Sequence, residues 1–152
     1  MREALKEARV AFAEDEVPVG AVVVYQDKII ARGHNEIERL KDATAHAEML
    51  ALTSAAGNLN QKWLSGASLY VTIEPCAMCC GALVLSRVKN LYFGAKDPKT
   101  GACGSVFNIA DNKKLNHRIK VKAGILEKEC GSLLTEFFRK KRKKSDKMGA
   151  LI

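Results

Sequence analysis

The sequence predicts an α/β sandwich, in which helices pack around a mixed β-sheet. Short apolar runs rich in β-branched residues alternate along the chain with segments whose apolar residues repeat at helical spacing. The first two runs are close enough to pair as a hairpin, and helical segments separate the later ones. A length of 152 residues with 47% hydrophobic residues suits one compact domain.

The first part of the chain is predicted to form a helix, a hairpin and a second helix. The N-terminal helix ends before Pro18 and has one apolar face with charged residues off it, formed by Ala4, Leu5, Ala8, Ala11 and Phe12. Strands are expected over 20–25 and 29–32, joined by a three-residue turn. A polar loop then leads to a helix over 45–56, which Gly57 is expected to end.

The rest of the chain alternates strands and helices. Pro75 precedes a helix, as proline favours the start of a helix. The expected elements are a strand over 69–73, a helix over 76–85, a strand over 91–93, a long loop, a strand over 119–123 and a last helix from 126 to about 144. Trp63 and Met78 are expected to lie in the core.

Positive charge is concentrated at the C-terminus. The net charge is +8, and residues 139–152 contribute +6 of it through seven basic residues and one acidic residue. We therefore divide the chain into a domain over 1–144 and a flexible basic tail over 145–152. A near-neutral body with a basic end suits a polyanionic partner, although a merely solvated terminus has the same composition.

The composition also bears on the cellular compartment. Apolar runs such as 17–25 are interrupted or shorter than the roughly 20 residues that a membrane span needs, and no signal-like segment opens the chain. Five cysteines are an odd number in a chain long enough to bury its own core, so reduced thiols are expected. These features predict a cytoplasmic protein without a membrane partner, whose thiols are free to bind metal.

Two short motifs carry chemistry, and both lie at predicted helix starts. One is His46-Ala47-Glu48, which arises easily by chance, and the other is Pro75-Cys76-Ala77-Met78-Cys79, which is far rarer. Cysteines three apart at a helix N-terminus can reach one metal, and the helix dipole favours their thiolate forms. His46 and Glu48 converge only if their helix meets the metal end-on, because positions two apart point in different directions.

These residues suit a catalytic zinc site. Two thiolates and one imidazole, from Cys76, Cys79 and His46, would hold one Zn²⁺ per chain and leave one tetrahedral position open for a water. Glu48 would then act as general acid and base without touching the metal. The alternative is a closed structural zinc site with a fourth protein ligand, for which the candidates are Cys80, Cys103, His34 and His117.

At this point the chain resembles the zinc-dependent nucleobase deaminases, whose known signature is H-x-E followed by P-C-x-x-C. The resemblance narrows to the bacterial tRNA-specific adenosine deaminases and covers nearly the whole chain up to about residue 144. It rests on 16–21, 34–35, 44–48, 69–76, 93–97 and 116–118. It implies a three-layer cytidine-deaminase-like fold with a five-stranded mixed sheet, a homodimer, and conversion of the wobble adenosine of a tRNA anticodon to inosine.

The resemblance also assigns roles to residues outside the metal group. Asn35 is expected to read the flipped adenine, and the Ala47 amide to hold its edge. The other expected RNA contacts are Asp97, Asn116, Phe137 and Phe138. Four of these residues have plainer alternatives: Asn35 and Asp97 could be turn residues, and at least one of Phe137 and Phe138 could belong to the core.

Cys80 departs from the family pattern, because the residue after the second cysteine ligand is usually small and does not bind the metal.

Two other functions also remain open. The first is deamination of a free nucleobase or nucleoside such as cytosine or guanine, which needs no basic tail. The second is a non-catalytic RNA-binding module in which zinc stabilises the fold. Glu48 would then have no function.

Overall fold

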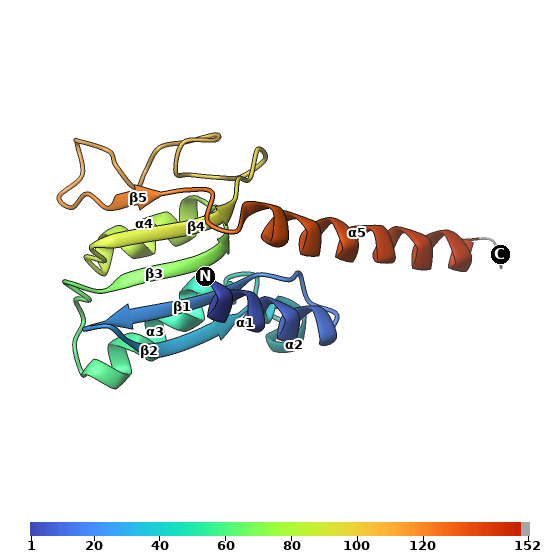
Figure 1. The fold of residues 1–152 in the computed structure, drawn as a ribbon, viewed down its shortest axis with the longest axis horizontal. Helices are drawn as coiled ribbons and strands as arrows, with labels where there is room; N and C mark the ends of the chain where they lie inside the picture. The colour runs from blue at the N-terminus through green and yellow to red at the C-terminus, as the bar shows by residue number, and fades with distance from the viewer. Residues whose placement is uncertain (150–152) are drawn as a thin grey trace.

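A computed structural model describes residues 1–149, with side chains described to residue 144. It contains one five-stranded sheet with the order β2-β1-β3-β4-β5 (Figure 1). The strands are β1 (Gly20–Tyr25), β2 (Lys28–His34), β3 (Ser68–Ile73), β4 (Asn90–Ala95) and β5 (Lys120–Lys122). The mixed α/β sheet predicted from the sequence is confirmed.

The sheet is antiparallel on one side and parallel on the other. β1 pairs antiparallel with both β2 and β3, whereas β3, β4 and β5 run parallel. The β1–β2 turn has two residues rather than three, because Tyr25 pairs directly with Lys28. Gln26 and Asp27 take positive φ values of 48° and 60°, as the tight turns that match the twist of a hairpin require.

Helices cover both faces of the sheet, which gives three layers. They are α1 (Arg2–Ala13), α2 (Ile37–Leu40), α3 (Ala47–Leu59), α4 (Ala77–Leu85) and α5 (Glu127–Gly149). α3 and α4 pack on one face and α1 and α5 on the other (Figure 1). α5 continues well beyond the sheet, so the predicted boundary at residue 144 falls inside this helix.

Two helix predictions need correction. The helix expected to end at Gly57 continues to Leu59, and the left-handed Asn60 ends it instead. A helical glycine costs only about 1 kcal/mol relative to alanine, which a packed helix tolerates. The single turn α2 lies in what the sequence indicated as a polar loop, since four residues are too few for a periodicity to be recognised.

The core lies between the sheet and the pair α3 and α4. Small residues let α3 approach the sheet closely: a side chain at Gly33 would lie 2.6 Å from the Ala47 carbonyl oxygen, so only glycine fits there. Trp63, predicted to be buried, is instead 45% exposed, with Arg87 stacked on its ring. Met78 is only partly buried.

Between residues 1 and 149, no helix is both long and apolar enough to cross a lipid bilayer.

Candidate metal centre and substrate pocket

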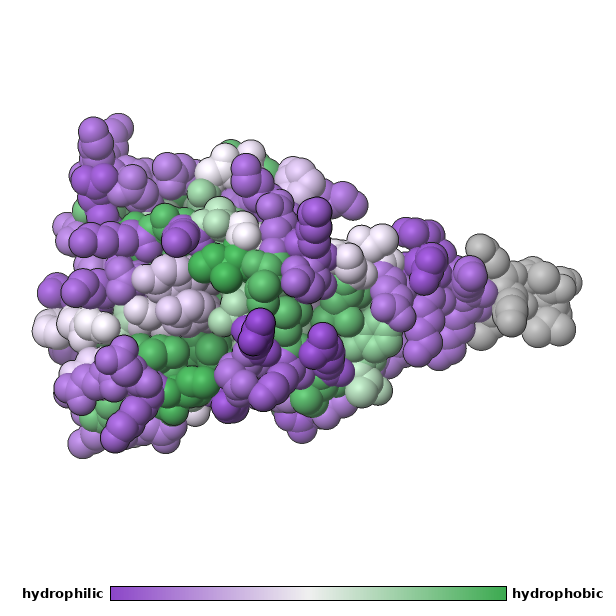
Figure 2. All heavy atoms as spheres, in the orientation of Figure 1, coloured by the Kyte–Doolittle hydropathy of each residue, from purple (hydrophilic) through white to green (hydrophobic). Residues whose placement is uncertain are grey.

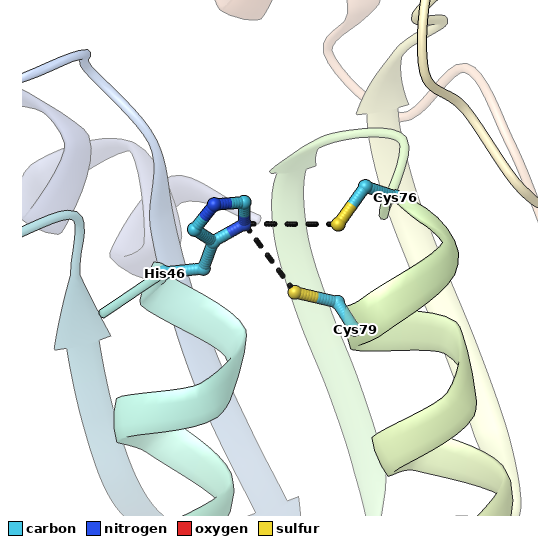
Figure 3. A group of neighbouring side chains, drawn as sticks. All are labelled: His46, Cys76 and Cys79. Atoms are coloured by element: carbon cyan, nitrogen blue, oxygen red, sulfur yellow. Dashed lines mark hydrogen bonds between the residues drawn. The ribbon is translucent and has the colours of Figure 1, made fainter. Parts of the chain in front are cut away.

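The N-termini of α3 and α4 lie side by side and bring three ligand-type side chains together. His46 is the N-cap of α3, Cys76 is the N-cap of α4, and Cys79 lies in the first turn of α4. His46 Nδ1 lies 3.8 Å from Cys76 Sγ and 3.5 Å from Cys79 Sγ (Figure 3). α3 therefore meets the site end-on, which is the arrangement that the His46-x-Glu48 spacing requires.

The spacing of these atoms fits a tetrahedral zinc ion. Zn–N and Zn–S bonds of about 2.0 and 2.3 Å at tetrahedral angles place a nitrogen and a sulfur about 3.5 Å apart. The three ligand atoms all lie within 4.8 Å of one another. These residues could therefore hold a metal ion without a change of backbone.

The two thiols shift each other's pKa in opposite directions. A hydrogen bond from Cys79, followed by one from His46, lowers the pKa of Cys76 to about 4. The same contact with Cys76, together with burial, raises the pKa of Cys79, and the contact with Cys76 raises the pKa of His46. A thiolate is thus favoured where a metal would need one.

The candidate fourth ligands lie elsewhere. Cys80 Sγ is 3.2 Å from Cys103 Sγ, and neither sulfur belongs to the group. His34 lies among glutamates, with Nε2 3.2 Å from Glu14, and His117 Nε2 is 2.7 Å from the Val88 carbonyl oxygen. Among residues 1–144, the ligand group has only its three members, which disfavours a closed structural site.

A pocket of about 480 Å³ opens above the ligand group. Its lining includes His46, Cys76 and Glu48, together with Leu134 and Phe138 of α5. Its volume is typical of small-molecule sites. Burial raises the pKa of Glu48, which is 3% exposed. A buried carboxyl group with a raised pKa is suited to proton transfer near neutral pH.

Asn35 lines the same pocket and is held in place by a buried glutamate. Its side-chain nitrogen donates to Glu16 at 3.3 Å, and Glu16 also accepts from the Arg39 amide at 2.7 Å. Asn35 and Glu16 are 4% and 2% exposed. The sequence alone assigned no role to Glu16, which lies within the 16–21 segment of the family resemblance, two residues before Pro18.

A second buried glutamate organises the loop that contributes Asp97 to the pocket lining. Glu74 accepts hydrogen bonds from the amides of Asp97, Cys103 and Ser105, and from the Ser105 hydroxyl. Burial alone would raise the pKa of Glu74, but these hydrogen bonds outweigh it and hold the pKa below its ordinary value. A side chain at Gly101 would overlap the Glu74 carboxyl group. Sequence reasoning missed Glu74 because its partners lie more than 20 residues away.

Asp97 lines the pocket but also forms a turn. Its carboxylate accepts from the Lys99 and Thr100 amides at 2.9 and 3.2 Å and from the Thr100 hydroxyl. Asp97 is therefore a turn residue, which was the plainer alternative considered from the sequence. Asp97, Pro98, Lys99 and Thr100 together make this turn one wall of the pocket.

Of the other predicted RNA contacts, namely Ala47, Asn116, Phe137 and Phe138, Phe138 alone lines the pocket. Phe137 is 3% exposed and packs edge-on against Phe12 with ring centroids 5.6 Å apart, so it belongs to the core. Phe138 is 42% exposed and lines the pocket. Ala47 is buried at the first helical position of α3, and Asn116 is exposed on the long loop and does not line the pocket.

Comparison with known proteins identifies the family. The MafB19-like deaminase family matches residues 1–142. A tRNA-specific adenosine deaminase of Aquifex aeolicus is 54% identical over 142 residues, which cover 93% of each chain. The chain therefore belongs to the MafB19-like deaminase family.

Solved structures agree with this assignment. A structure from a study of A-to-I editing by tRNA:A34 deaminases at the wobble position superposes on this deaminase with a TM-score of 0.85 and 44% identity, covering 88% of this chain and 97% of the other. A guanine deaminase from Nitrosomonas europaea superposes with a TM-score of 0.77 and 28% identity, covering 90% and 81%. The fold is thus the cytidine-deaminase-like fold implied by the sequence resemblance.

Proposed function

We propose that this deaminase converts the wobble adenosine of a tRNA anticodon to inosine, with water consumed and ammonia released. The observation that carries the proposal is the single pocket that is lined by His46, Cys76, Glu48 and Asn35 together. Such a site combines metal ligands, a proton-transfer group and a hydrogen-bonding group for a base. The relatives named for tRNA adenosine deamination support the choice of substrate.

We infer that His46, Cys76 and Cys79 hold one zinc ion per chain. The nitrogen-to-sulfur distances and the three-member ligand group support this assignment. When bound, the zinc ion lowers the pKa of a coordinated water towards neutrality and so supplies the nucleophile.

Glu48 moves the protons. Its buried carboxylate accepts a proton from the attacking water and delivers it to the ring nitrogen next to the reacting carbon. It then takes the remaining proton from the hydroxyl that has added to that carbon and transfers it to the exocyclic amine, so that the C–N bond breaks, a carbonyl forms and ammonia leaves. Burial of Glu48 raises its pKa, which suits both directions of transfer.

Asn35 orients the base, and Glu16 orients Asn35. Because Glu16 accepts from the Asn35 side-chain nitrogen, the amide oxygen of Asn35 is left to face the pocket and can accept from a base. The exposed ring of Phe138 at the rim is placed to stack on a nucleotide beside the target. Ala47, Asp97 and Asn116 stay proposals as RNA contacts.

Features around the pocket favour RNA over a free base. Lys96 and Lys99 lie at the pocket, and Arg142 lies with Phe138 beside it. Hydrophilic side chains cover the described part of α5 beyond the sheet (Figure 2). A free nucleobase carries no phosphate, so these cations would have no partner in a free-base deaminase.

The proposal includes a homodimer in a reducing, cytoplasm-like compartment. A second copy would cover exposed apolar side chains such as Leu85 at the end of α4, which is 78% exposed. The free state of all five cysteines fits a reducing compartment.

The decisive experiment compares substrates for the zinc-loaded protein. We expect inosine to form on an anticodon stem-loop with a wobble adenosine, with far slower turnover of free adenine, cytosine or guanine. A stem-loop with guanosine at the wobble position is the matched control. Turnover of free guanine with none on the stem-loop would instead select the activity named for the Nitrosomonas relative, and zinc binding without any turnover would select the non-catalytic module.

A further inference from the structure

Two cysteines outside the metal group lie in contact with each other. Cys80 Sγ and Cys103 Sγ are 3.2 Å apart, although the residues are 23 positions apart in sequence. Cys80 lies in α4 directly after Cys79, and Cys103 lies in the loop between β4 and β5. The group of three ligands uses neither sulfur. The deamination proposed above gives this pair no role.

The backbone on both sides of the pair is anchored to the same short segment. The Ala102 amide donates to the Pro75 carbonyl at 2.8 Å, and the Cys103 amide donates to Glu74 at 2.9 Å. The Cys80 amide donates to the Cys76 carbonyl at 2.9 Å. The two sulfurs are thus held opposite each other, and a disulfide, with sulfurs about 2 Å apart, requires them to approach by only about 1 Å.

The two thiols differ in their access to solvent. Cys103 is partly exposed and lines a second pocket of about 410 Å³, together with Ser105 and Asn108. Cys80 is fully buried. A small oxidant would therefore reach Cys103 first, and Cys80 would be the nearby thiol that resolves the oxidised sulfur.

We propose that Cys80 and Cys103 form a reversible disulfide that ties α4 to the wall of the substrate pocket. A peroxide is the oxidant class: it oxidises the Cys103 thiol to a sulfenic acid and is itself reduced to water. The Cys80 sulfur then attacks the Cys103 sulfur, the S–O bond breaks, and a second water leaves. Two thiols lose two electrons and two protons in total, and a dithiol reductant reverses the reaction.

The proposed disulfide would restrict a loop that lines the substrate pocket. The loop that carries Cys103 begins with Asp97, Pro98, Lys99 and Thr100, which line the pocket. A disulfide would covalently fix this loop to the helix that carries Cys76 and Cys79 without using either of their sulfurs. It would also close a chain loop of more than 20 residues, for which the chain-entropy account of disulfides predicts a rise in Tm of about 7–14 °C for a domain of this size.

The test uses the zinc-loaded protein and hydrogen peroxide. Thiols are counted after denaturation with a chelator, zinc release is followed during oxidation, and the linked residues are located by tandem mass spectrometry. We expect the count to fall from five to three, with Cys80 joined to Cys103, zinc retained, Tm raised, and all changes reversed by dithiothreitol.

Variants separate this pair from other thiols. The single variants Cys80→Ser and Cys103→Ser should each keep their four remaining thiols. Cys103 is partly exposed, so Cys103→Ser still provides the test if substitution of the buried Cys80 prevents folding. The control Cys130→Ser removes a buried cysteine outside the pair and should fall from four thiols to two. Thiol loss in step with zinc release, a link between Cys76 and Cys79, or oxidation of Cys103 to acids without a link would each overturn the proposal.

Discussion

At the scale of single residues, Cys79 and Cys80 are adjacent in sequence but contact different partners. Cys79 faces His46 Nδ1 at 3.5 Å, whereas Cys80 faces Cys103. The helical turn explains the difference, because adjacent residues point about 100° apart around the axis. The order of two identical side chains therefore decides which can bind the metal.

The metal assignment predicts unequal effects of substitution at these neighbours. Cys79→Ser should lose zinc, because a serine hydroxyl remains protonated where a thiolate ligand is needed. Cys80→Ser should keep one zinc per chain. Elemental analysis of the purified variants gives the comparison, and retention in Cys79→Ser with loss in Cys80→Ser would contradict the assignment.

The proposed proton transfer gives a second prediction at this scale. Glu48→Gln should keep the fold and the zinc but lower kcat on the anticodon stem-loop by about 10²–10⁴-fold, because an amide cannot accept the proton. Zinc content, circular dichroism and inosine formation are measured on the same sample. A variant that keeps most of its activity would assign the proton transfer to another residue.

At the scale of elements, the loop after β4 depends on Glu74. This carboxylate accepts hydrogen bonds from three amides and one hydroxyl of the loop that forms the pocket wall. Gln at this position brings an NH₂ group against amide donors, which leaves some of them without an acceptor. We expect Glu74→Gln to lower the free energy of unfolding by about 1–3 kcal/mol, measured by urea denaturation at pH 7.

The pKa of Glu74 gives this prediction a pH dependence. Because the folded-state pKa lies below the ordinary value of 4.5, the contribution of Glu74 to stability is present above that value and is lost as the pH falls through the folded-state pKa. The difference in stability between wild type and Glu74→Gln should therefore narrow below about pH 4.5. A difference that does not change with pH would point to a packing effect. Lys99→Gln is a control that changes charge on the same loop without touching Glu74.

At the scale of the whole molecule, the basic helix α5 has two sides. Lys141 forms an ion pair with Asp15 at 2.8 Å, and Lys140 lies over the Phe12 ring. These two lysines contact α1 and Asp15, just beyond its end. Arg139, Arg142, Lys143 and Lys144 are exposed, as is Lys140 despite its contact with Phe12.

This division refines the experiment on RNA binding. Replacing Arg139, Arg142, Lys143 and Lys144 with Gln should weaken stem-loop binding and reduce its salt dependence by up to roughly one unit of slope per lost phosphate contact. Zinc content and the preference for adenosine should not change. The matched control is Lys140→Gln with Lys141→Gln, which should affect binding less. Equal affinity and slope in the fourfold variant and wild type would show that this stretch is only a solvated helix.

Local patterns predicted most of the elements. The strand over 20–25 appears with those bounds because six consecutive apolar or small residues end at a turn. The last helix was expected from its periodicity and continues to Gly149. Trp63 was misplaced because hydrophobicity alone favours burial, whereas Lys62 and Arg87 stack on its ring at the surface.

The sequence by itself determined the chemistry of the site. Cys76 and Cys79 lie close because one helical turn separates them, and local geometry suffices for that. Only the tertiary structure decided what meets across the fold: that Cys80 faces Cys103, that Glu16 holds Asn35, that Glu74 anchors a distant loop, and that Phe138 rather than Phe137 is exposed. These contacts depend on how the helices and loops pack on the sheet, and no local periodicity encodes the distance between residues that are far apart in the chain.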